Sequence, residues 1–196
     1  MIDAAVAALR AGKPVVLPTD TVYGLCAEPT EAAAAEVARL KGREAAQPTA
    51  LLAPSVEALL EAVPELPEPV LRSLLPGAYT LVLPNPGRRF PWLAGDTLGV
   101  RVPELPAETA LILEAAGPVL ATSANLHGGA DPRRLEDVPQ RIREGCGAVV
   151  DGGELPGTPS TVLDLTGEEP RLLREGAVPA TSARRKAEAA MRAGRT

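Results

Sequence analysis

The order of apolar and polar positions along the chain predicts alternating helices and strands. Residues 2–10 place Val6 and Leu9 on one helical face, and Gly12 ends this segment before the apolar run 15–17, which is typical of a strand. Further strands are predicted at 49–53, 79–83, 98–102, 119–121, 148–151 and 161–165. Further helices are predicted at 56–62, 69–75, 107–116 and 135–143.

The connections between these elements indicate a mixed sheet. Thr30 is a good N-cap for a second helix that runs to about Leu40, so Lys41 and Arg43 lie at or just beyond its C-terminus. Strands and helices interleave irregularly, and the gap at 84–96 has the length of a hairpin connection. We therefore predict an α/β fold with one twisted mixed β-sheet flanked by helices.

Length and composition predict a single domain with an aliphatic core. The chain has 196 residues, and its composition does not change abruptly along its length. Hydrophobic residues make up 45% but aromatic residues only 2%, so the core must consist mainly of Leu, Val and Ala. Residues 181–196 are basic and alanine-rich without a strong apolar stripe, so we expect a domain over 1–180 and a frayed helix or mobile tail after it.

Charge and cysteine content exclude several classes of protein. The net charge is −5, which argues against nucleic-acid binding over the whole surface. The sequence has no apolar run of about 20 residues and no signal-peptide pattern at its start, so we expect a cytoplasmic protein without membrane contact. Cys26, Cys146 and the single His127 lack metal-ligand spacing, which argues against zinc and against a disulfide framework; we expect the cysteines to be buried apolar residues.

Candidate chemistry begins with the segment 121–125, Ala-Thr-Ser-Ala-Asn. An apolar strand runs directly into this cluster of hydroxyl and amide groups, which predicts a polar site at a strand's carboxyl end. Lys41 and Arg43 lie two residues apart and, in an extended segment, would reach one side together and suit a triphosphate. The same two residues are also typical of a solvated helix end, where cations complement the helix dipole.

Three other positions are ambiguous when taken singly. The loop 18–24 places two hydroxyls and a carboxylate after a strand, but such residues also form ordinary turns. Arg101 interrupts an apolar β run and needs a partner if it points inward, whereas an outward arginine is equally compatible with the pattern. Ser160 at the start of one strand and Arg174 at the end of another are each compatible with ordinary strand ends.

Common nucleophile and nucleotide motifs are missing from the sequence. Ser123 and His127 make a poor catalytic dyad because no G-x-S-x-G elbow is present and the histidine lies in a glycine-rich loop. Neither a P-loop nor a G-x-G-x-x-G fingerprint occurs, so any nucleotide must be bound by a different architecture.

Six ordered motifs together resemble the YrdC/Sua5 (SUA5/YciO/YrdC) family. The resemblance covers nearly residues 1–178 and implies a YrdC-like fold with a concave ligand cavity. The motifs are Pro-Thr-Asp-Thr-Val-Tyr-Gly-Leu (18–25), Lys-Gly-Arg (41–43), Pro-Gly (76–77) before Thr-Leu-Val-Leu (80–83), Gly-Val-Arg-Val-Pro (99–103), Ser-Ala-Asn (123–125) and Pro-Ser-Thr-Val (159–162).

The resemblance implies a nucleotidyltransferase activity, L-threonylcarbamoyladenylate synthesis. L-Threonine, bicarbonate and ATP would give L-threonylcarbamoyladenylate and pyrophosphate, with Mg²⁺ accompanying the triphosphate and held mainly by phosphates and water. The product would feed t6A37 biosynthesis through the tRNA threonylcarbamoyl-transfer machinery, and weak RNA binding is a further implied property.

The resemblance also implies roles for particular residues. Lys41 and Arg43 would be catalytic. The ATP-binding set would be Lys41, Arg43, Thr97, Ser123, Asn125 and Arg174, and the threonine-binding set would be Thr21, Arg101 and Ser160, with no metal held by protein groups alone. As exposed cations in a cleft, Lys41 and Arg43 would contribute little to the stability of the fold.

Three positions depart from the family pattern. Gln47 brings no charge where the family often has Lys or Asn, and His127 and Asp131 stand where hydroxyl residues are common. We expect Asp131 to lie outside the site, because its charge would repel phosphate. The length resembles the short bacterial type.

Three alternatives remain open from sequence. The first is a non-catalytic nucleotide- or RNA-binding YciO-like paralogue. The second is a carbamoyl-transfer domain for hydrogenase maturation, which the missing cysteine clusters disfavour, and the third is a serine hydrolase.

Overall fold

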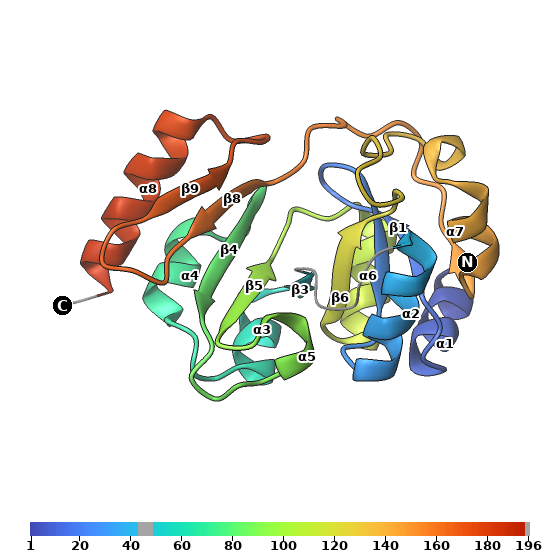
Figure 1. Cartoon of the computed structure of the whole chain (residues 1–196), viewed down its shortest axis with the longest axis horizontal. Coiled ribbons are helices and arrows are strands. Elements are labelled where there is room, and N and C mark those ends of the chain that lie inside the picture. The colour runs from blue at the N-terminus through green and yellow to red at the C-terminus, as the bar shows by residue number, and fades with distance from the viewer. Residues whose placement is uncertain (43–48, 195–196) are drawn as a thin grey trace.

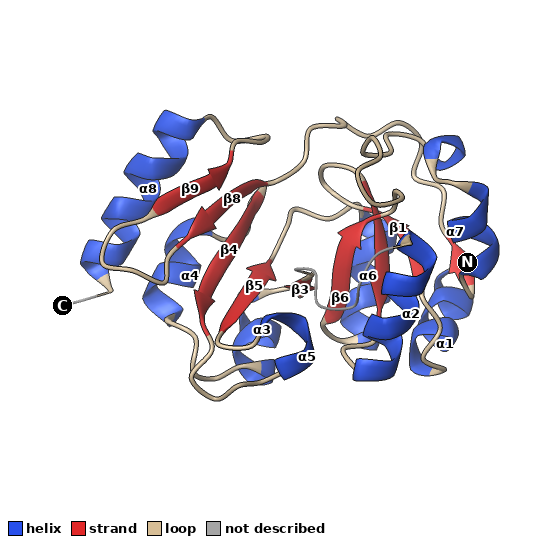
Figure 2. Cartoon of the chain, in the orientation of Figure 1, coloured by secondary structure: helices blue, strands red, loops and turns tan. Residues whose placement is uncertain are grey.

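The computed structural model describes residues 1–42 and 49–194, which form a mixed nine-stranded sheet with helices packed against it (Figures 1 and 2). Three neighbouring pairs are parallel, β7 with β1, β3 with β5 and β4 with β8, and the other pairs are antiparallel. This confirms the predicted mixed α/β sheet. In sheet order the strands are β7 (Ala148–Val149), β1 (Val15–Pro18), β2 (Tyr23–Ala27), β6 (Val119–Ser123), β3 (Ala50–Leu52), β5 (Thr97–Arg101), β4 (Tyr79–Pro84), β8 (Thr161–Asp164) and β9 (Arg171–Arg174).

Helices cover both faces of one half of the sheet. Val15 and Leu17 of β1 pack with α1 (Ile2–Arg10) and α6 (Ala107–Ala116). Val16, between them, points to the opposite face and packs with α2 (Glu31–Lys41) and α7 (Gln140–Gly145). Because successive side chains of a strand point to opposite faces, all four residues of β1 are buried.

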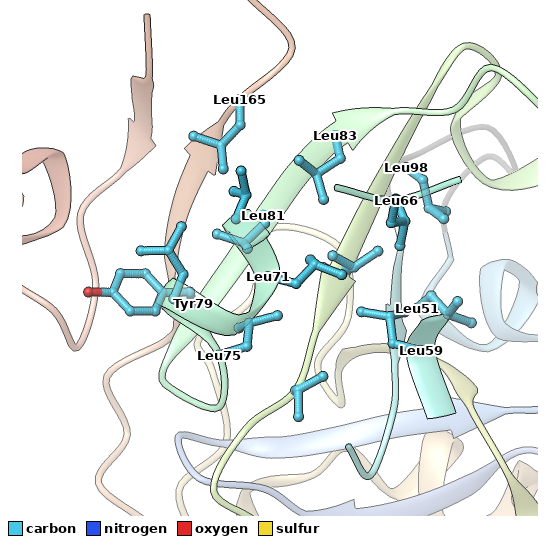
Figure 3. Packing of buried hydrophobic residues seen from close by; sticks show 14 of the residues in the cluster. Leu51, Leu59, Leu66, Leu71, Leu75, Tyr79, Leu81, Leu83, Leu98 and Leu165 are labelled. Carbon is cyan, nitrogen blue, oxygen red and sulfur yellow. The ribbon is translucent and has the colours of Figure 1, made fainter. Parts of the chain in front are cut away.

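The other half of the sheet has a core on only one face. Leu81 and Leu83 of β4 lie in one cluster with Leu59 of α3 (Val56–Ala62) and Leu71 of α4 (Glu68–Leu74) (Figure 3). Residues of α8 (Ala180–Ala193) belong to the same cluster. Thr80 and Val82, which alternate with them, are half-buried on the opposite face. The short helix α5 (Pro91–Ala94) lies in the connection from β4 to β5. This alternation leaves one face of the sheet's middle available for a cavity.

The predicted helices agree with the structure except at one site. The helices α1 and α6 have the predicted bounds, and Thr30 caps α2 by accepting a hydrogen bond from the backbone amide of Ala33 at 3.3 Å. The predicted helix 135–143 is wrong, because it divides into the 3₁₀ turn η1 (Leu135–Asp137) and α7. Pro139 lies between the two and lacks the amide that a continuous helix would use.

The segment after residue 180 belongs to the core, which corrects the predicted separate tail. The helix α8 packs on α4, and three of its alanines are buried in the same cluster as the leucines of β4. Ala183, Ala187 and Ala190 recur at helical spacing and form a narrow stripe of small side chains. Because this stripe contains only alanine, it does not stand out in the sequence as an apolar face.

No helix within residues 1–42 and 49–194 combines the length and the apolar character that a membrane span requires.

Enlarging the buried stripe of α8 should destabilise the whole domain. Ala187 is fully buried, whereas Ala189 on the same helix is exposed. We expect Ala187→Leu to lower the free energy of unfolding by about 2 kcal/mol through overpacking, and Ala189→Leu to change it little. Urea denaturation of both variants measures the difference. Equal small effects would show that α8 is not packed on the domain.

Candidate active site

A cavity of about 450 Å³ lies over the middle of the sheet on the face without a helical core. The connection from β1 to β2 contributes Thr21 to its wall, and β5 contributes Thr97, Gly99 and Arg101. The remaining lining residues are Val22, Thr49, Ala50, Thr80, Val82, Ala121, Thr122, Ser123, Asp131, Pro159, Ser160, Val162, Leu173 and Arg174.

Most of the predicted site residues come together at this cavity. Six line it although they are far apart in sequence: Thr21, Thr97, Arg101, Ser123, Ser160 and Arg174. Among the described residues, Lys41 and Asn125 are buried beside the wall that Ser123 forms, and neither lines the cavity. Arg43 and Gln47 lie outside the described residues.

Lys41 is a buried cation that holds the loop after β6. It is 4% exposed, and its ammonium donates to the carbonyl oxygen of Ser123 and, at 2.8 Å each, to the carbonyl oxygen and Oδ1 of Asn125. Gly42 ends α2 in the left-handed conformation with φ 65°, which places Lys41 in the last turn of this helix. The expectation of an exposed cleft cation is therefore wrong for Lys41.

Asn125 extends this network toward the cavity. Its Oδ1 also accepts from Ser123 Oγ at 2.8 Å, and its Nδ2 donates to the carbonyl oxygen of Gly129 at 2.6 Å and to Asp131 Oδ1 at 3.2 Å. Asp131 lines the cavity, so the expectation that it lies outside the site is wrong. The hydrogen bond from the Asn125 amide holds Asp131 at the cavity wall. The expectation was wrong because it considered only the repulsion between Asp131 and phosphate and not this contact.

Arg101 points inward and has a carboxylate partner. Its side chain is 12% exposed, and its Nη2 donates to Asp20 Oδ1 at 2.8 Å and to Thr21 Oγ1 at 3.4 Å. Burial lowers the pKa of the Arg101 guanidinium, the charge of Asp20 opposes this shift, and the nearby charge of Arg174 adds to it. The outward-facing alternative for Arg101 is thus excluded.

A second arginine approaches the cavity from β9. Arg174 donates from Nη2 to the carbonyl oxygen of Ser160 at 2.9 Å. The hydroxyls of Ser160 and Thr80 are 2.7 Å apart and share a hydrogen bond. Thr80 lies in one of the quoted motifs but was not assigned to the site, although its alternation with the buried residues of β4 was a usable signal.

His127 and the cysteines do not form a nucleophilic site. Ser123 Oγ donates to Asn125 Oδ1, and His127 lies exposed in the following loop. Cys26 is buried and Cys146 half-buried, and burial raises the pKa of both thiols to about 12, so neither is a thiolate at neutral pH. This geometry disfavours the serine hydrolase alternative.

Protein carboxylates are scarce around the cavity. Within residues 1–42 and 49–194, no three His, Cys, Asp or Glu side chains are grouped as metal ligands would be. Asp131 is the one carboxylate of the described residues in the cavity lining. The polar groups that line the cavity beside its apolar residues are therefore mainly arginines and hydroxyls, which suits an anionic small molecule.

An open mixed sheet with two arginines and several hydroxyls over its centre defines a small-molecule-binding α/β protein. The Sua5_yciO_yrdC family model, described as Telomere recombination, matches residues 7–176. A threonylcarbamoyl-AMP synthase of Stenotrophomonas maltophilia is 36% identical over 159 residues, which cover 77% of this chain and 86% of that protein. The chain belongs to the Sua5/YciO/YrdC family, as its motifs predicted.

Solved structures of the family have the same fold. The Pyrococcus abyssi Sua5 structure complexed with L-threonine superposes with a TM-score of 0.83 and 33% identity, over 94% of this chain and 56% of that chain. The Escherichia coli YciO structure superposes with a TM-score of 0.77 and 30% identity, over 91% of this chain and 90% of that chain. This chain thus spans little more than half the length of the P. abyssi protein.

Removing the Lys41 ammonium should destabilise the fold as well as the site. Lys41→Met would leave three buried oxygen acceptors without this donor, so we expect a loss of about 3 kcal/mol in the free energy of unfolding. Lys186→Met removes an exposed lysine and serves as the control, with little expected change. Denaturant unfolding compares the two, and equal stability would contradict the structural role of Lys41.

Proposed function

We propose that this chain is a nucleotidyltransferase that forms L-threonylcarbamoyladenylate and pyrophosphate from L-threonine, bicarbonate and ATP for t6A37 biosynthesis. The observation that carries the proposal is the inward Arg101 beside Thr21 in a cavity that a second arginine, Arg174, also lines. The names of the relatives support the proposal, because one is a threonylcarbamoyl-AMP synthase and one solved relative is complexed with L-threonine.

The threonine end of the cavity would be formed by Arg101, Thr21 and Ser160. An arginine offers parallel N–H groups that match a carboxylate, and nearby hydroxyls can bond the remaining polar groups of an amino acid. Arg101 comes from β5, Thr21 from the connection between β1 and β2, and Ser160 from the residue before β8. Recognition at this end would thus depend on the relative positions of three segments.

The ATP end would be formed by Thr97, Ser123, Arg174 and, from outside the described residues, Arg43. In this proposal Lys41 and Asn125 act on ATP through the loop they hold, because their polar groups bond one another and Ser123. A fixed loop presents its donors without reorganisation as charge develops on the phosphates.

The reaction requires alignment and charge stabilisation by these residues. The threonine amine would attack the carbon of bicarbonate, and water would leave to give a carbamate. A carbamate oxygen would then attack the α-phosphorus of ATP while pyrophosphate leaves. Arg101 would fix the amino acid, and Arg174 would stabilise negative charge on the phosphates. No covalent bond to the enzyme is needed in this route.

Mg²⁺ would enter with ATP in this proposal. The scarcity of carboxylates in the cavity suits an ion held mainly by phosphates and water, with Asp131 as the candidate protein group. When bound, the ion would neutralise part of the triphosphate charge.

We further propose that the chain acts in the cytoplasm and that its product passes to the tRNA threonylcarbamoyl-transfer machinery. A net charge of −5 favours weak affinity for RNA at most.

Incubation of the purified chain with L-threonine, bicarbonate, ATP and Mg²⁺ tests the proposed activity. We expect pyrophosphate release that depends on both threonine and bicarbonate, and a product with the mass of threonylcarbamoyl-AMP. Arg174→Ala should lower kcat/KM for ATP roughly 100-fold, whereas Arg72→Ala, which removes a half-exposed arginine of α4, should leave turnover unchanged. ATP binding without any threonine-dependent product would contradict the proposal.

Filling the cavity from Gly99 should block substrates without unfolding the chain. A Cβ at Gly99 would meet Ala50 at 3.7 Å and Thr80 at 3.8 Å, which are ordinary contacts, so Gly99→Ala should fold and retain activity. Gly99→Leu adds atoms that extend into the cavity, and we expect its affinity for ATP or threonine to fall at least 10-fold at a nearly unchanged melting temperature. Calorimetric titration measures the affinities. Undiminished affinity in Gly99→Leu would place the substrates elsewhere.

A further inference from the structure

Asp20 and Arg101 form a buried ion pair, and the function proposed above assigns no role to Asp20. The Asp20 side chain is 8% exposed and lies behind Arg101, and within the described part of the chain Asp20 is not in the cavity lining. Removing two charges from water is costly, and a buried pair of this kind is often no more stabilising than apolar residues of equal size. The contact therefore requires an explanation other than stability.

Hydrogen bonds hold Asp20 in place from both sides. Thr19 Oγ1 donates to the carbonyl oxygen of Val22 at 2.7 Å, which closes a turn around Asp20. The carbonyl oxygen of Thr21 accepts from the amide of Gly157 at 2.8 Å, which ties this turn to the segment before β8. The carboxylate is thus presented to Arg101 by a connection that these hydrogen bonds fasten at both ends.

Two polar atoms of this ion pair also lack a hydrogen-bond partner among the described residues. Asp20 Oδ2 and Arg101 Nε are both buried, and no described protein group bonds either atom. Oδ1 accepts from Arg101 Nη2 at 2.8 Å and from Thr21 Oγ1 at 3.3 Å, so both of these hydrogen bonds fall on one carboxylate oxygen. Such under-bonding fits a pair that is kept for orientation of the guanidinium.

The orientation of the Arg101 guanidinium matters because a second arginine, Arg174, lies nearby. Both arginines line the cavity, and their like charges repel one another. A guanidinium that lacked Asp20 would leave a buried positive charge uncompensated and free to take another rotamer. The carboxylate of Asp20 holds one edge of Arg101 and sets which edge an incoming anion meets.

We propose that Asp20 is a positioning residue for the amino-acid carboxylate, and that it acts through Arg101. This inference rests on the proposed function, because it assigns Arg101 to the carboxylate of threonine. It predicts that loss of the Asp20 charge weakens threonine binding and spares ATP binding. A purely structural role for Asp20 would instead affect both ligands together.

Asp20→Asn keeps the size of the side chain and removes its charge. We expect the Kd for L-threonine, measured by calorimetry, to rise at least 10-fold, and the Kd for ATP to change less than twofold. Asp164→Asn is the matched control, because Asp164 is also 8% exposed and paired with an arginine, Arg171, but neither residue lines the cavity among the described residues. We expect the control to lower stability and leave both affinities unchanged.

The outcomes of this comparison are distinct. Wild-type threonine affinity in Asp20→Asn, or an equal loss for threonine and ATP, would overturn the positioning role. Failure of the wild-type chain to bind threonine would overturn the proposed function and this inference together. If Asp20→Asn does not fold, the smaller Asp20→Ser tests the same pattern of loss.

A double-mutant cycle tests whether Asp20 acts through Arg101. Arg101→Ala should weaken threonine binding strongly. Adding Asp20→Asn to Arg101→Ala should cause no further loss, because the group that Asp20 positions is already absent. A further 10-fold loss in the double variant would show that Asp20 acts on threonine independently of Arg101, and would contradict the proposed route.

Discussion

The ammonium group of Lys41 holds together the wall on which the rest of the site depends. Three oxygen atoms from Ser123 and Asn125 converge on it, across a separation of more than 80 residues in sequence. In addition, the backbone amide of His127 donates to the carbonyl oxygen of Lys41 at 3.0 Å. These bonds tie the end of α2 to the loop after β6. The positions of Ser123 and Asp131 at the cavity follow from this tie.

The cavity lies where helices cover only one face of the sheet. Around β1 and β2 both faces are packed against helices, whereas the buried core residues of β4 and β5 lie on one face only. On their other face Thr80 and Thr97 supply hydroxyls, and Gly99 has no side chain to fill the space. The same alternation that builds the core therefore also leaves an open floor that carries hydroxyl groups among apolar residues. The fold that carries this floor is shared by the Sua5 and YciO structures.

Local signals in the sequence predicted the elements better than the contacts between them. Thr30 and the apolar face of residues 2–10 gave correct helices because capping and helical periodicity are properties of short segments. The strand β2 was not predicted, since all five of its residues are buried and its Tyr-Gly-Leu-Cys-Ala run shows no alternation. The alanine stripe of α8 is recognisable only beside α4, against which it packs.

The same division between local signals and long-range contacts applies to the site. The family resemblance pointed to six cavity-lining residues, of which Thr21, Arg101, Ser123 and Ser160 lie within the quoted motifs and Thr97 and Arg174 lie outside them. The burial of Lys41, the inward direction of Arg101 and the placement of Asp131 all depend on partners more than five residues away. The loop 18–24 drew attention to the carboxylate of Asp20, but its pairing with Arg101 was not predicted. Tertiary contacts thus decide which charges are available to a ligand and which hold the protein in position.

A crystal structure of the chain with L-threonine and a non-hydrolysable ATP analogue would show where both substrates bind. We expect both ligands in the one cavity, with the threonine carboxylate on Arg101 and the phosphates beside Ser123 and Arg174. Binding of either ligand outside this cavity, or a carboxylate that contacts Arg174 and leaves Arg101 with Asp20 alone, would contradict this assignment.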